Sequence, residues 1–167
     1  MRHSRPLLAL IGALAIGACA RSPPPPPTSA ASNAGKVFLA RNARARGVHV
    51  TASGLQYRIL RSGPASGLRP KPADEVKVNY EGKLLDGRVF DSSFVRGQPV
   101  AMTLRDLVPG WVEALQLMRP GDEWQLFVPP SLGYGDKGAG PIPPGAVLEF
   151  EIELIDVLPD SSSVGRA

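Results

Sequence analysis

The residues in this chain that could do chemistry are mostly aromatic. Nine of the ten aromatic residues lie between Tyr57 and Phe150. Several stand beside turn signals, where strands or a helix are expected to end, and such residues could line an apolar cleft between a helix and a sheet. These are Tyr80, Phe90, Trp111, Tyr134 and Phe150. The alternative is that all five are ordinary core residues. Trp111 at the start of a helix and Tyr134 in a Gly-rich loop suit a pocket better.

Covalent and metal chemistry have few residues to use. The 167-residue chain has one cysteine, Cys19, and two histidines, of which His3 lies at the N-terminus and only His49 lies further along. A single cysteine excludes an intramolecular disulfide framework and a multi-Cys zinc site. We find no phosphate-binding loop, metal-ligand spacing or nucleophile–base pair. The sequence therefore predicts neither a metal nor another cofactor.

The charge and composition exclude two further classes of protein. The net charge of +4 and the pI of 9.6 would suit a nucleic-acid binder. Without Arg2 and Arg5, which lie in a segment expected to be removed, the net charge falls to +2, which is a weak electrostatic signal. The 18 Gly and 18 Pro residues stay below the proportion that indicates disorder throughout. We expect a globular domain that does not bind nucleic acid.

The N-terminus is typical of a secretory signal peptide over residues 1–18. Basic residues precede an apolar run, Leu7–Ala18, which is shorter than the roughly 20 residues that a spanning helix needs. Two readings of its end stay open. Cleavage after Ala20 would leave a cysteine-free protein, whereas residues 16–19 resemble a bacterial lipobox in which Cys19 becomes lipidated. We favour lipidation, because the only cysteine stands where the lipobox requires it.

Residues 19–31 are interpreted as a lipidated cysteine followed by a linker. The linker contains five consecutive prolines, Pro23–Pro27, which favour an extended polyproline II spacer. A ligand for an SH3- or WW-type domain is the alternative, and a spacer suits an envelope protein better. Ala20 after the cysteine resembles the outer-membrane sorting pattern, so we expect a protein on the periplasmic side of the envelope, anchored to the outer membrane.

A short helix is predicted over residues 32–47. Ser32 and Asn33 can cap its start, and Gly47 supplies a C-terminal stop. Arginines fall toward its end, at positions 41, 44 and 46, where they would complement the helix dipole. They could instead contact phospholipid headgroups, and a solvated helix end is the reading we favour.

Residues 50–158 read as one α+β domain, a curved antiparallel β-sheet wrapped around one short α-helix. Period-two alternation marks strands over 55–60, 76–81, 88–91, 100–104, 124–128 and 148–154. Pro109-Gly110 opens a helix with Trp111, Leu115 and Met118 at i, i+4 and i+7, which Pro120-Gly121 ends. Residues 159–167 read as a flexible polar tail.

Three segments closely resemble the FKBP-type peptidyl-prolyl cis–trans isomerases. They read VNYEGKLLDGRVFDSS (78–93), LVPGWVEALQLMRPGDEWQLFVPPSLGYGDKG (107–138) and IPPGAVLEFEIELIDV (142–157). The preceding NAGKVFLARNARARGVHVTASGLQYRIL (33–60) resembles the bacterial macrophage-infectivity-potentiator branch of that family. The family fold, a curved antiparallel sheet around a short helix, agrees with the fold that the periodicity predicts.

The resemblance implies a prolyl pocket. Trp111 would form its floor, Asp91 would lie at its rim, and Tyr134 would offer a hydroxyl. Ile142 would add a wall and a backbone N–H, in a loop that Pro141 stiffens. The remaining apolar walls would be Tyr80, Phe90, Leu107, Val108 and Phe150. Val100 and Met102 stand where some members carry aromatic residues, so that wall is less aromatic here.

The implied activity is rotation of X–Pro peptide bonds in envelope proteins, without covalent catalysis. Tyr80, Phe90, Asp91 and Tyr134 would be the catalytic residues. Asp91 would orient Tyr80 or polarise the amide, or it would satisfy backbone N–H groups of the turn at residues 91–93. The implied partners are proline-containing polypeptides and macrolide inhibitors. A non-catalytic, membrane-tethered chaperone that uses the same cleft is the alternative. We expect a monomer, because only a short helical piece precedes Gly47.

Overall fold

A computed structural model of the chain describes residues 30–160. The predicted signal peptide over 1–18, the predicted lipidation site Cys19, the proline run and most of the predicted tail lie outside the described residues. So do Arg2, Arg5 and His3. Nothing in the structure therefore bears on the choice between cleavage after Ala20 and lipidation.

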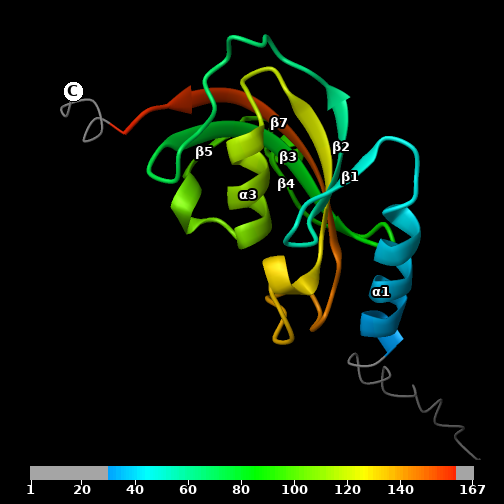
Figure 1. Cartoon of the computed structure of the whole chain (residues 1–167). Helices are drawn as coiled ribbons and strands as arrows, with labels where there is room; N and C mark the ends of the chain where they lie inside the picture. The colour runs from blue at the N-terminus through cyan, green and yellow to red at the C-terminus, as the bar shows by residue number, and fades with distance from the viewer. Residues whose placement is uncertain (1–29, 161–167) are drawn as a thin grey trace, which may run out of the picture.

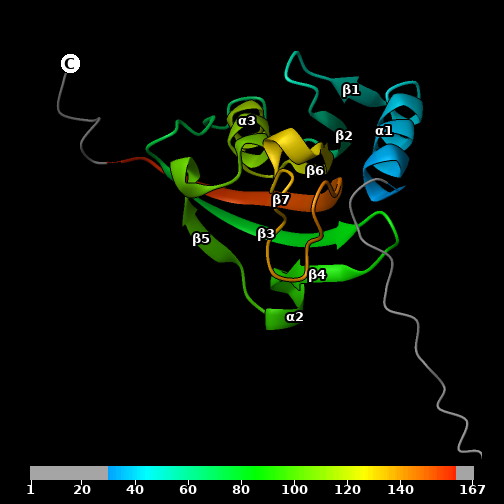
Figure 2. The same cartoon turned by 90° about the horizontal axis from the view of Figure 1, so that it is seen from below.

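The described chain folds as a seven-stranded sheet in which every strand pairing is antiparallel, with the order β1-β2-β6-β7-β3-β4 and β5 also paired to β3. The element bounds are α1 Ala30–Asn42, β1 Val48–Val50, β2 Gln56–Arg61, β3 Glu75–Leu84, β4 Val89–Ser92, α2 Ser93–Arg96, β5 Val100–Thr103, η1 Leu104–Asp106, α3 Pro109–Leu117, β6 Glu123–Val128, η2 Pro130–Leu132 and β7 Leu148–Leu158. The sheet curves around α3, as Figures 1 and 2 show. The predicted fold is confirmed.

Along β3 and most of β7, buried side chains alternate with less buried ones, so one face of the sheet, the concave one, forms the core. Val76, Val78 and Leu84 of β3 are buried, and so are Leu148, Ile152 and Leu154 of β7, while Glu149, Glu151 and Glu153 alternate with them. Register shifts between Lys77 and Val78, and between Gly82 and Lys83, interrupt the ladders of β3. Such bulges add twist and bend a strand, which lets the sheet close around one helix.

Helix α3 fills the concave face. Pro109 stands in its first turn, and its buried side chains are Trp111, Ala114 and Leu115, with fully buried Met118 at the C-cap. Pro is well suited to this position because its missing N–H would have no helical partner there. Gly121 then donates its N–H to the Leu154 carbonyl at 2.7 Å, which ties the turn after α3 to β7.

The chain leaves the edge of β3 and returns to it. Strand β4 pairs with residues 81–83 of β3, and β5 pairs with residues 75–78 of the same strand. Helix α2 occupies the gap between them. Ser92 caps α2 by accepting the Val95 N–H, and Gly97 ends it with a φ of +72°. We call residues 92–97 the α2 detour.

Helix α1 packs on the side of the sheet opposite α3. Phe127, which alternates with the core residues Leu126 and Val128, lies 5.6 Å from Phe38 of α1 between ring centroids. Gly35 allows a close approach, since a Cβ there would lie 2.8 Å from Cγ2 of Val147. Figure 2 shows α1 and α3 on different sides of the strands.

The N-terminal prediction needs three corrections. The helix runs from Ala30 to Asn42 rather than over 32–47, so Ser32 and Asn33 lie within it and do not cap it, and Arg44 and Arg46 lie in the turn that follows it. Gly47 instead allows that turn a φ of +77° before β1, a three-residue strand too short to be recognised from alternation. The third correction is at Gln56, which the β2 alternation places with solvent-facing residues but which is only 5% exposed.

The Gln56 side chain is buried because it joins α1 to the sheet. Its Nε2 donates to the Leu39 carbonyl at 2.9 Å, and its Oε1 accepts from Asn42 Nδ2 at 2.9 Å. Ile59, expected on the core side with Leu55 and Tyr57, is 41% exposed because the strand runs out past the core.

We predict that Gln56→Leu lowers the free energy of unfolding by about 1–3 kcal/mol, because the Asn42 amide and the Leu39 carbonyl lose their partner. Denaturant unfolding followed by circular dichroism measures this. Leu60→Ala, at an exposed position of the same strand, is the control and should cost less than about 0.5 kcal/mol. Equal costs for the two variants would contradict a joining role for Gln56.

Candidate active site

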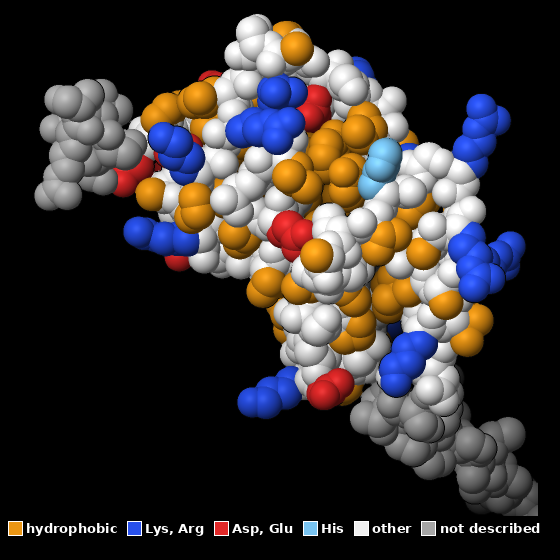
Figure 3. All heavy atoms as spheres, viewed as in Figure 1, with side chains coloured by type: hydrophobic (Ala, Val, Ile, Leu, Met, Phe, Trp, Pro, Cys, Tyr) orange, Lys and Arg blue, Asp and Glu red, His pale blue; other side chains and the backbone are white. Residues whose placement is uncertain are grey.

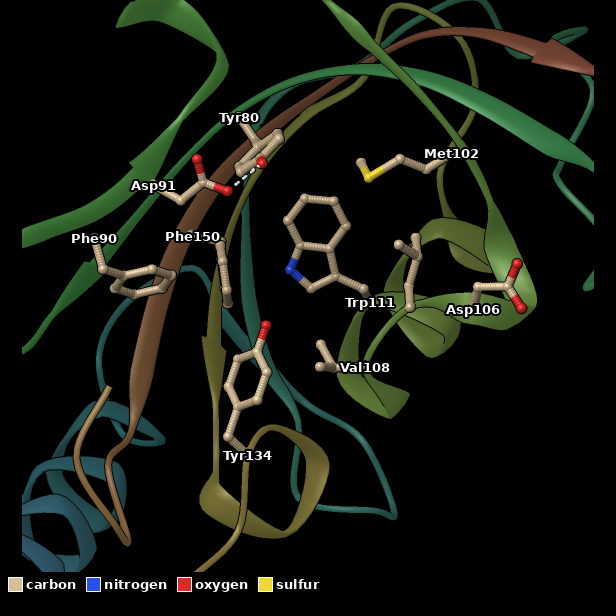
Figure 4. A pocket seen from close by; sticks show the side chains of 10 residues that line it. Tyr80, Phe90, Asp91, Met102, Asp106, Val108, Trp111, Tyr134 and Phe150 are labelled. Carbon is tan, nitrogen blue, oxygen red and sulfur yellow. Dashed lines mark hydrogen bonds between the residues drawn. The ribbon is translucent and has the colours of Figure 1, made fainter. Parts of the chain in front are cut away.

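An apolar cavity of about 250 Å³ opens between the N-terminal end of α3 and the concave face of the sheet. It is smaller than the roughly 300–1,000 Å³ typical of sites for free small molecules, and this size suits one apolar side chain of a longer polymer. Ten residues line it: Tyr80, Phe90, Asp91, Met102, Asp106, Leu107, Val108, Trp111, Tyr134 and Phe150. Figure 4 shows Tyr80, Trp111, Tyr134 and Phe150 around a common space, with the Asp106 carboxylate turned away from it.

Trp111 forms the base of the cavity. Its ring is 4% exposed and meets two others edge to face, Tyr80 at 5.1 Å and Phe150 at 5.2 Å between centroids. Phe90 contacts Phe150 in the same way at 5.6 Å. Edge-to-face packing fixes ring orientations, so the walls are held in place without a ligand. The indole Nε1 is buried without a hydrogen-bond partner among the described residues.

Glycine at position 82 lets these walls approach one another. A Cβ there would lie 2.7 Å from atoms of both Phe90 and Phe150. Gly82 sits in β3, where it pairs with Asp91 on one side and Phe150 on the other. The strand register thus brings Phe90, Asp91 and Phe150 together from segments far apart in the sequence.

The rim carries a charged network that the sequence did not reveal in full. The Tyr80 hydroxyl donates to Asp91 Oδ2, and Arg96 Nη1 donates to Asp91 Oδ1. Arg96 Nη2 also donates to the Tyr80 hydroxyl at 2.9 Å, and its guanidinium lies 5.5 Å from the centre of the Tyr80 ring. Asp91 therefore orients Tyr80, and the backbone N–H of Ser92 also donates to the Asp91 carboxylate, so the orienting role and the predicted role in the turn coexist. The turn at residues 92–95 uses Ser92 Oγ rather than Asp91 as its cap.

Ser93 fixes the position of this network. Its fully buried Oγ accepts the Tyr80 N–H at 2.8 Å and lies 3.3 Å from the Tyr80 carbonyl oxygen, to which it donates. The α2 detour is thereby attached to β3 beside the pocket. Arg96, at the end of the detour, is held where it reaches both Asp91 and Tyr80.

The network shifts the pKa values of its members. Burial raises the pKa of the Asp91 carboxyl, but the hydrogen bonds from Tyr80 and Arg96 outweigh this and hold its pKa below the ordinary value. Burial, followed by the hydrogen bond to Asp91, raises the pKa of the Tyr80 hydroxyl. The hydrogen bond to Asp91 also raises the pKa of Arg96. Carboxylate, phenol and guanidinium thus keep their charge states across the neutral range.

Tyr134 reaches the cavity from the opposite side. It follows η2, is 40% exposed, and its hydroxyl points into the cavity (Figure 4). That hydroxyl makes no hydrogen bond to another described residue and so can donate to a ligand. Neither a metal-binding group of His, Cys, Asp and Glu residues nor a histidine on the pocket wall is present among residues 30–160. His49 stacks on Tyr57 instead.

Eight of the nine residues predicted for the pocket are brought together, and Ile142 is not. Ile142 is buried, but it does not line the cavity. Its N–H donates to the Ala139 carbonyl at 2.8 Å, while its own carbonyl accepts from Ala139 at 2.9 Å. This bridge closes the loop that contains Pro141 and occupies the N–H expected to meet the substrate. Val100 is also absent from the lining, whereas Met102 forms part of it.

Comparison with known proteins identifies the family. The model described as FKBP-type peptidyl-prolyl cis-trans isomerase matches residues 67–155, and the model described as the domain amino terminal to FKBP-type peptidyl-prolyl isomerase matches residues 27–59. The first match covers more than half of the chain. The protein belongs to the FKBP-type peptidyl-prolyl cis–trans isomerase family.

Bacterial members of the family have sequences similar to this chain. The chain is 47% identical over 125 residues to the FKBP-type 22 kDa peptidyl-prolyl cis-trans isomerase of Escherichia coli, which covers 74% of this chain and 60% of that protein. It is 48% identical over 123 residues to the peptidyl-prolyl cis-trans isomerase Mip of Coxiella burnetii, covering 73% and 53%. The resemblance to the macrophage-infectivity-potentiator branch is confirmed. The chain spans little more than half the length of these two relatives.

Solved structures agree with the fold. The crystal structure of FkpA from Escherichia coli matches with a TM-score of 0.74 and 40% identity, over 77% of this chain and 60% of that one. A peptidyl-prolyl cis-trans isomerase from Pseudomonas syringae matches with a TM-score of 0.72 and 39% identity, over 78% of this chain and 95% of that one.

We predict that Trp111→Ala lowers the free energy of unfolding by about 3–5 kcal/mol, because it leaves a large void beneath Tyr80 and Phe150. Chemical denaturation measures the change. Val95→Ala, at a side chain 84% exposed on α2, should stay within about 0.5 kcal/mol of the parent protein. A cost below about 1 kcal/mol for Trp111→Ala would mean that the indole does not support the walls.

Proposed function

We propose that this protein is an active peptidyl-prolyl cis–trans isomerase that accepts X–Pro segments of unfolded or extended polypeptides. The observation that carries the proposal is the preformed cavity: a Trp111 base and aromatic walls beside a fixed Tyr80–Asp91–Arg96 rim. Its size suits a proline ring, and its opening leaves room for the chain on either side. Membership of the family supports the same activity.

The chemistry requires no nucleophile. Rotation about an X–Pro bond is slowed by amide resonance, with a barrier of about 18–20 kcal/mol, and takes tens of seconds or longer without a catalyst. An acceleration of about five decades corresponds to a barrier about 7 kcal/mol lower. The planar amide places negative charge on its oxygen and is stabilised by water, whereas the twisted transition state has lost that resonance. A dry aromatic pocket therefore favours the twisted amide over the planar one.

The rim residues have separate roles in this proposal. Asp91, paired with Arg96, holds the Tyr80 ring against Trp111, and the Arg96 cation offsets the Asp91 charge. The free Tyr134 hydroxyl donates to a substrate carbonyl and positions the chain. Phe90 and Phe150 exclude water from the proline. Macrolides that present a proline-like ring would compete for the same cavity.

We predict that the purified protein accelerates cis–trans relaxation of a short proline peptide. Trp111→Leu should lower kcat/KM by at least about tenfold, a loss equivalent to about 1.4 kcal/mol of transition-state stabilisation. Trp124→Leu is the matched control, because Trp124 is equally buried but lies outside the cavity, and it should keep most of the activity. A folded parent protein that shows no acceleration would refute the proposed function.

The pH profile gives an independent prediction. Because the pKa of Asp91 is lowered and that of Tyr80 is raised, kcat/KM should be flat from about pH 5 to pH 9. The Asp91–Arg96 interaction is complete above the ordinary aspartate pKa of about 3.9 and is lost as the pH falls through the lowered pKa. Activity should therefore decline only below about pH 4, with circular dichroism confirming the fold. Asp91→Asn should not show this decline at low pH. A change of kcat/KM centred near pH 7 would contradict the role given to Asp91.

The location is proposed from the sequence. We propose that Cys19 carries the lipid anchor and that the protein works on the periplasmic side of the outer membrane, as a monomer. Among residues 30–160 no helix is both long and apolar enough to cross a bilayer. Mass spectrometry of the mature N-terminus tests the anchor: an acylated Cys19 supports it, and a chain that begins at Arg21 refutes it.

A chaperone activity is the second candidate, and the α2 detour favours it. Phe94 and Val95 are 51% and 84% exposed beside the pocket rim, although Ser93 and the Ser92 cap hold the detour firmly. Rigidly presented apolar side chains next to a prolyl pocket can bind apolar residues of an unfolded chain. Such binding would be separate from catalysis.

We predict that Phe94→Ser/Val95→Ser reduces suppression of aggregation of an unfolded protein by several-fold while changing the rate on a short proline peptide by less than about twofold. Light scattering and the peptide assay measure the two properties. Leu68→Ser/Leu158→Ser, at exposed apolar positions that do not line the cavity, is the control. Equal loss of suppression in both double variants would show that general surface apolarity, and not the detour, is responsible.

A further inference from the structure

Charge is divided unevenly along the chain. Residues 30–73 contain eight Lys and Arg residues and no Asp or Glu, and all 15 acidic residues of the chain lie at position 74 or later. The domain that contains the pocket is therefore acidic on balance, and the N-terminal part of the described chain is strongly basic. Such asymmetry between two parts of a chain points to a polyanionic partner for the basic part.

Three of these cations follow one another closely at the end of α1 and in the turn after it. Arg41, Arg44 and Arg46 are all exposed, and we call them the basic face. Figure 3 shows Lys and Arg side chains along the edge of the molecule that α1 forms, with no Asp or Glu among them. No member of the basic face forms an ion pair with another described residue, whereas Arg61, Arg88, Arg96 and Lys83 all do.

Two further features belong to this face. The Arg58 side chain of β2 lies next to the turn, because its Cγ would be 4.0 Å from a Cβ at Gly47. Its buried Nε has no hydrogen-bond partner within residues 30–160. Val37 is 69% exposed and stands one helical turn before Arg41, on the same side of α1. The surface thus combines unpaired cations, which can meet anionic headgroups, with one exposed apolar side chain.

Because Arg44 and Arg46 lie beyond the helix end, the helix dipole does not account for them. In place of the solvated helix end favoured from the sequence, we propose that the basic face binds the surface of an anionic phospholipid bilayer. Reading a nucleic-acid sequence or stacking on single-stranded bases would require a recognition helix with base-reading side chains or exposed aromatic rings. The exposed aromatic side chains of the described chain, Phe94 and Tyr134, belong to the pocket side instead. A flat bilayer needs only clustered cations and shallow apolar contact, which this face supplies.

Binding through the basic face would orient the active site. Helix α1 lies on the side of the sheet opposite α3, and the cavity opens beside α3 (Figure 2). A bilayer against α1 therefore leaves the cavity facing away from the lipid, and the acidic remainder of the domain is repelled from the same surface. The proposal does not depend on isomerase activity.

The test compares partitioning of the purified full chain onto phosphatidylglycerol–phosphatidylcholine vesicles and onto pure phosphatidylcholine vesicles. Any anchor upstream contributes equally to both, so the ratio reports the basic face. Each basic residue near an anionic leaflet strengthens binding about fivefold. Arg41→Gln/Arg44→Gln/Arg46→Gln should therefore lower the ratio by about a hundredfold, and the same positions changed to Lys should keep it.

The matched control removes three exposed cations elsewhere, Lys77→Gln/Arg105→Gln/Lys137→Gln, and should lower the ratio by less than about threefold. Molar salt should abolish the preference, because it shortens the screening length to about 3 Å. If both triple glutamine variants lower the partitioning ratio equally, only net charge matters and the proposal is overturned. It would also be overturned if the parent protein shows no preference for phosphatidylglycerol, or if it binds duplex DNA or polyglutamate through the basic face but ignores the vesicles.

Discussion

The fold depends on one constraint, which is that a single nine-residue helix must cover the apolar face of the sheet. Helix α3 is about 14 Å long, whereas β7, with 11 residues, spans about 36 Å. A flat sheet would leave most of its apolar face in water. The sheet therefore bends around the helix, and the part of the concave face beyond the N-terminal end of α3 stays open. The cavity is that uncovered part, closed at its base by Trp111.

The sequence predicted the parts of this arrangement that depend on local pattern. Alternation along β3 and β7 identified the core face, and Pro109 marked the start of the helix. Aromatic residues beside turns suggested five of the pocket residues, and the others came from resemblance. Alternation alone does not separate Phe150, which faces the cavity, from Ile152, which faces the core. Both occupy the same face of the same strand. Only the length of α3 decides which of them is covered.

What the sequence could not supply depends on contacts between distant segments. Arg96 looked like an ordinary surface residue, and its role follows from the way Ser93 attaches α2 to the Tyr80 backbone. Gln56 carried no sign that α1 would cover it. Ile142 was misplaced because the bridge to Ala139, which occupies its N–H, is a property of the loop and not of any motif. Asp106 was not foreseen, and it lines the cavity because β5 returns to the edge of β3, which also places Met102 on the wall where the resemblance put it.

Strands β4 and β5, which the segment at residues 93–99 connects, both pair with β3. This arrangement affects how the fold can vary. Strand β3 keeps partners along most of this edge even though the chain leaves it between Ser92 and Val100. The register on either side is fixed by separate ladders, and within the intervening segment only Ser93 and Arg96 are tied to Tyr80 and Asp91, so the exposed side chains of Phe94 and Val95 are free to change. Affinity for different clients could therefore diverge there while catalysis and stability are inherited unchanged.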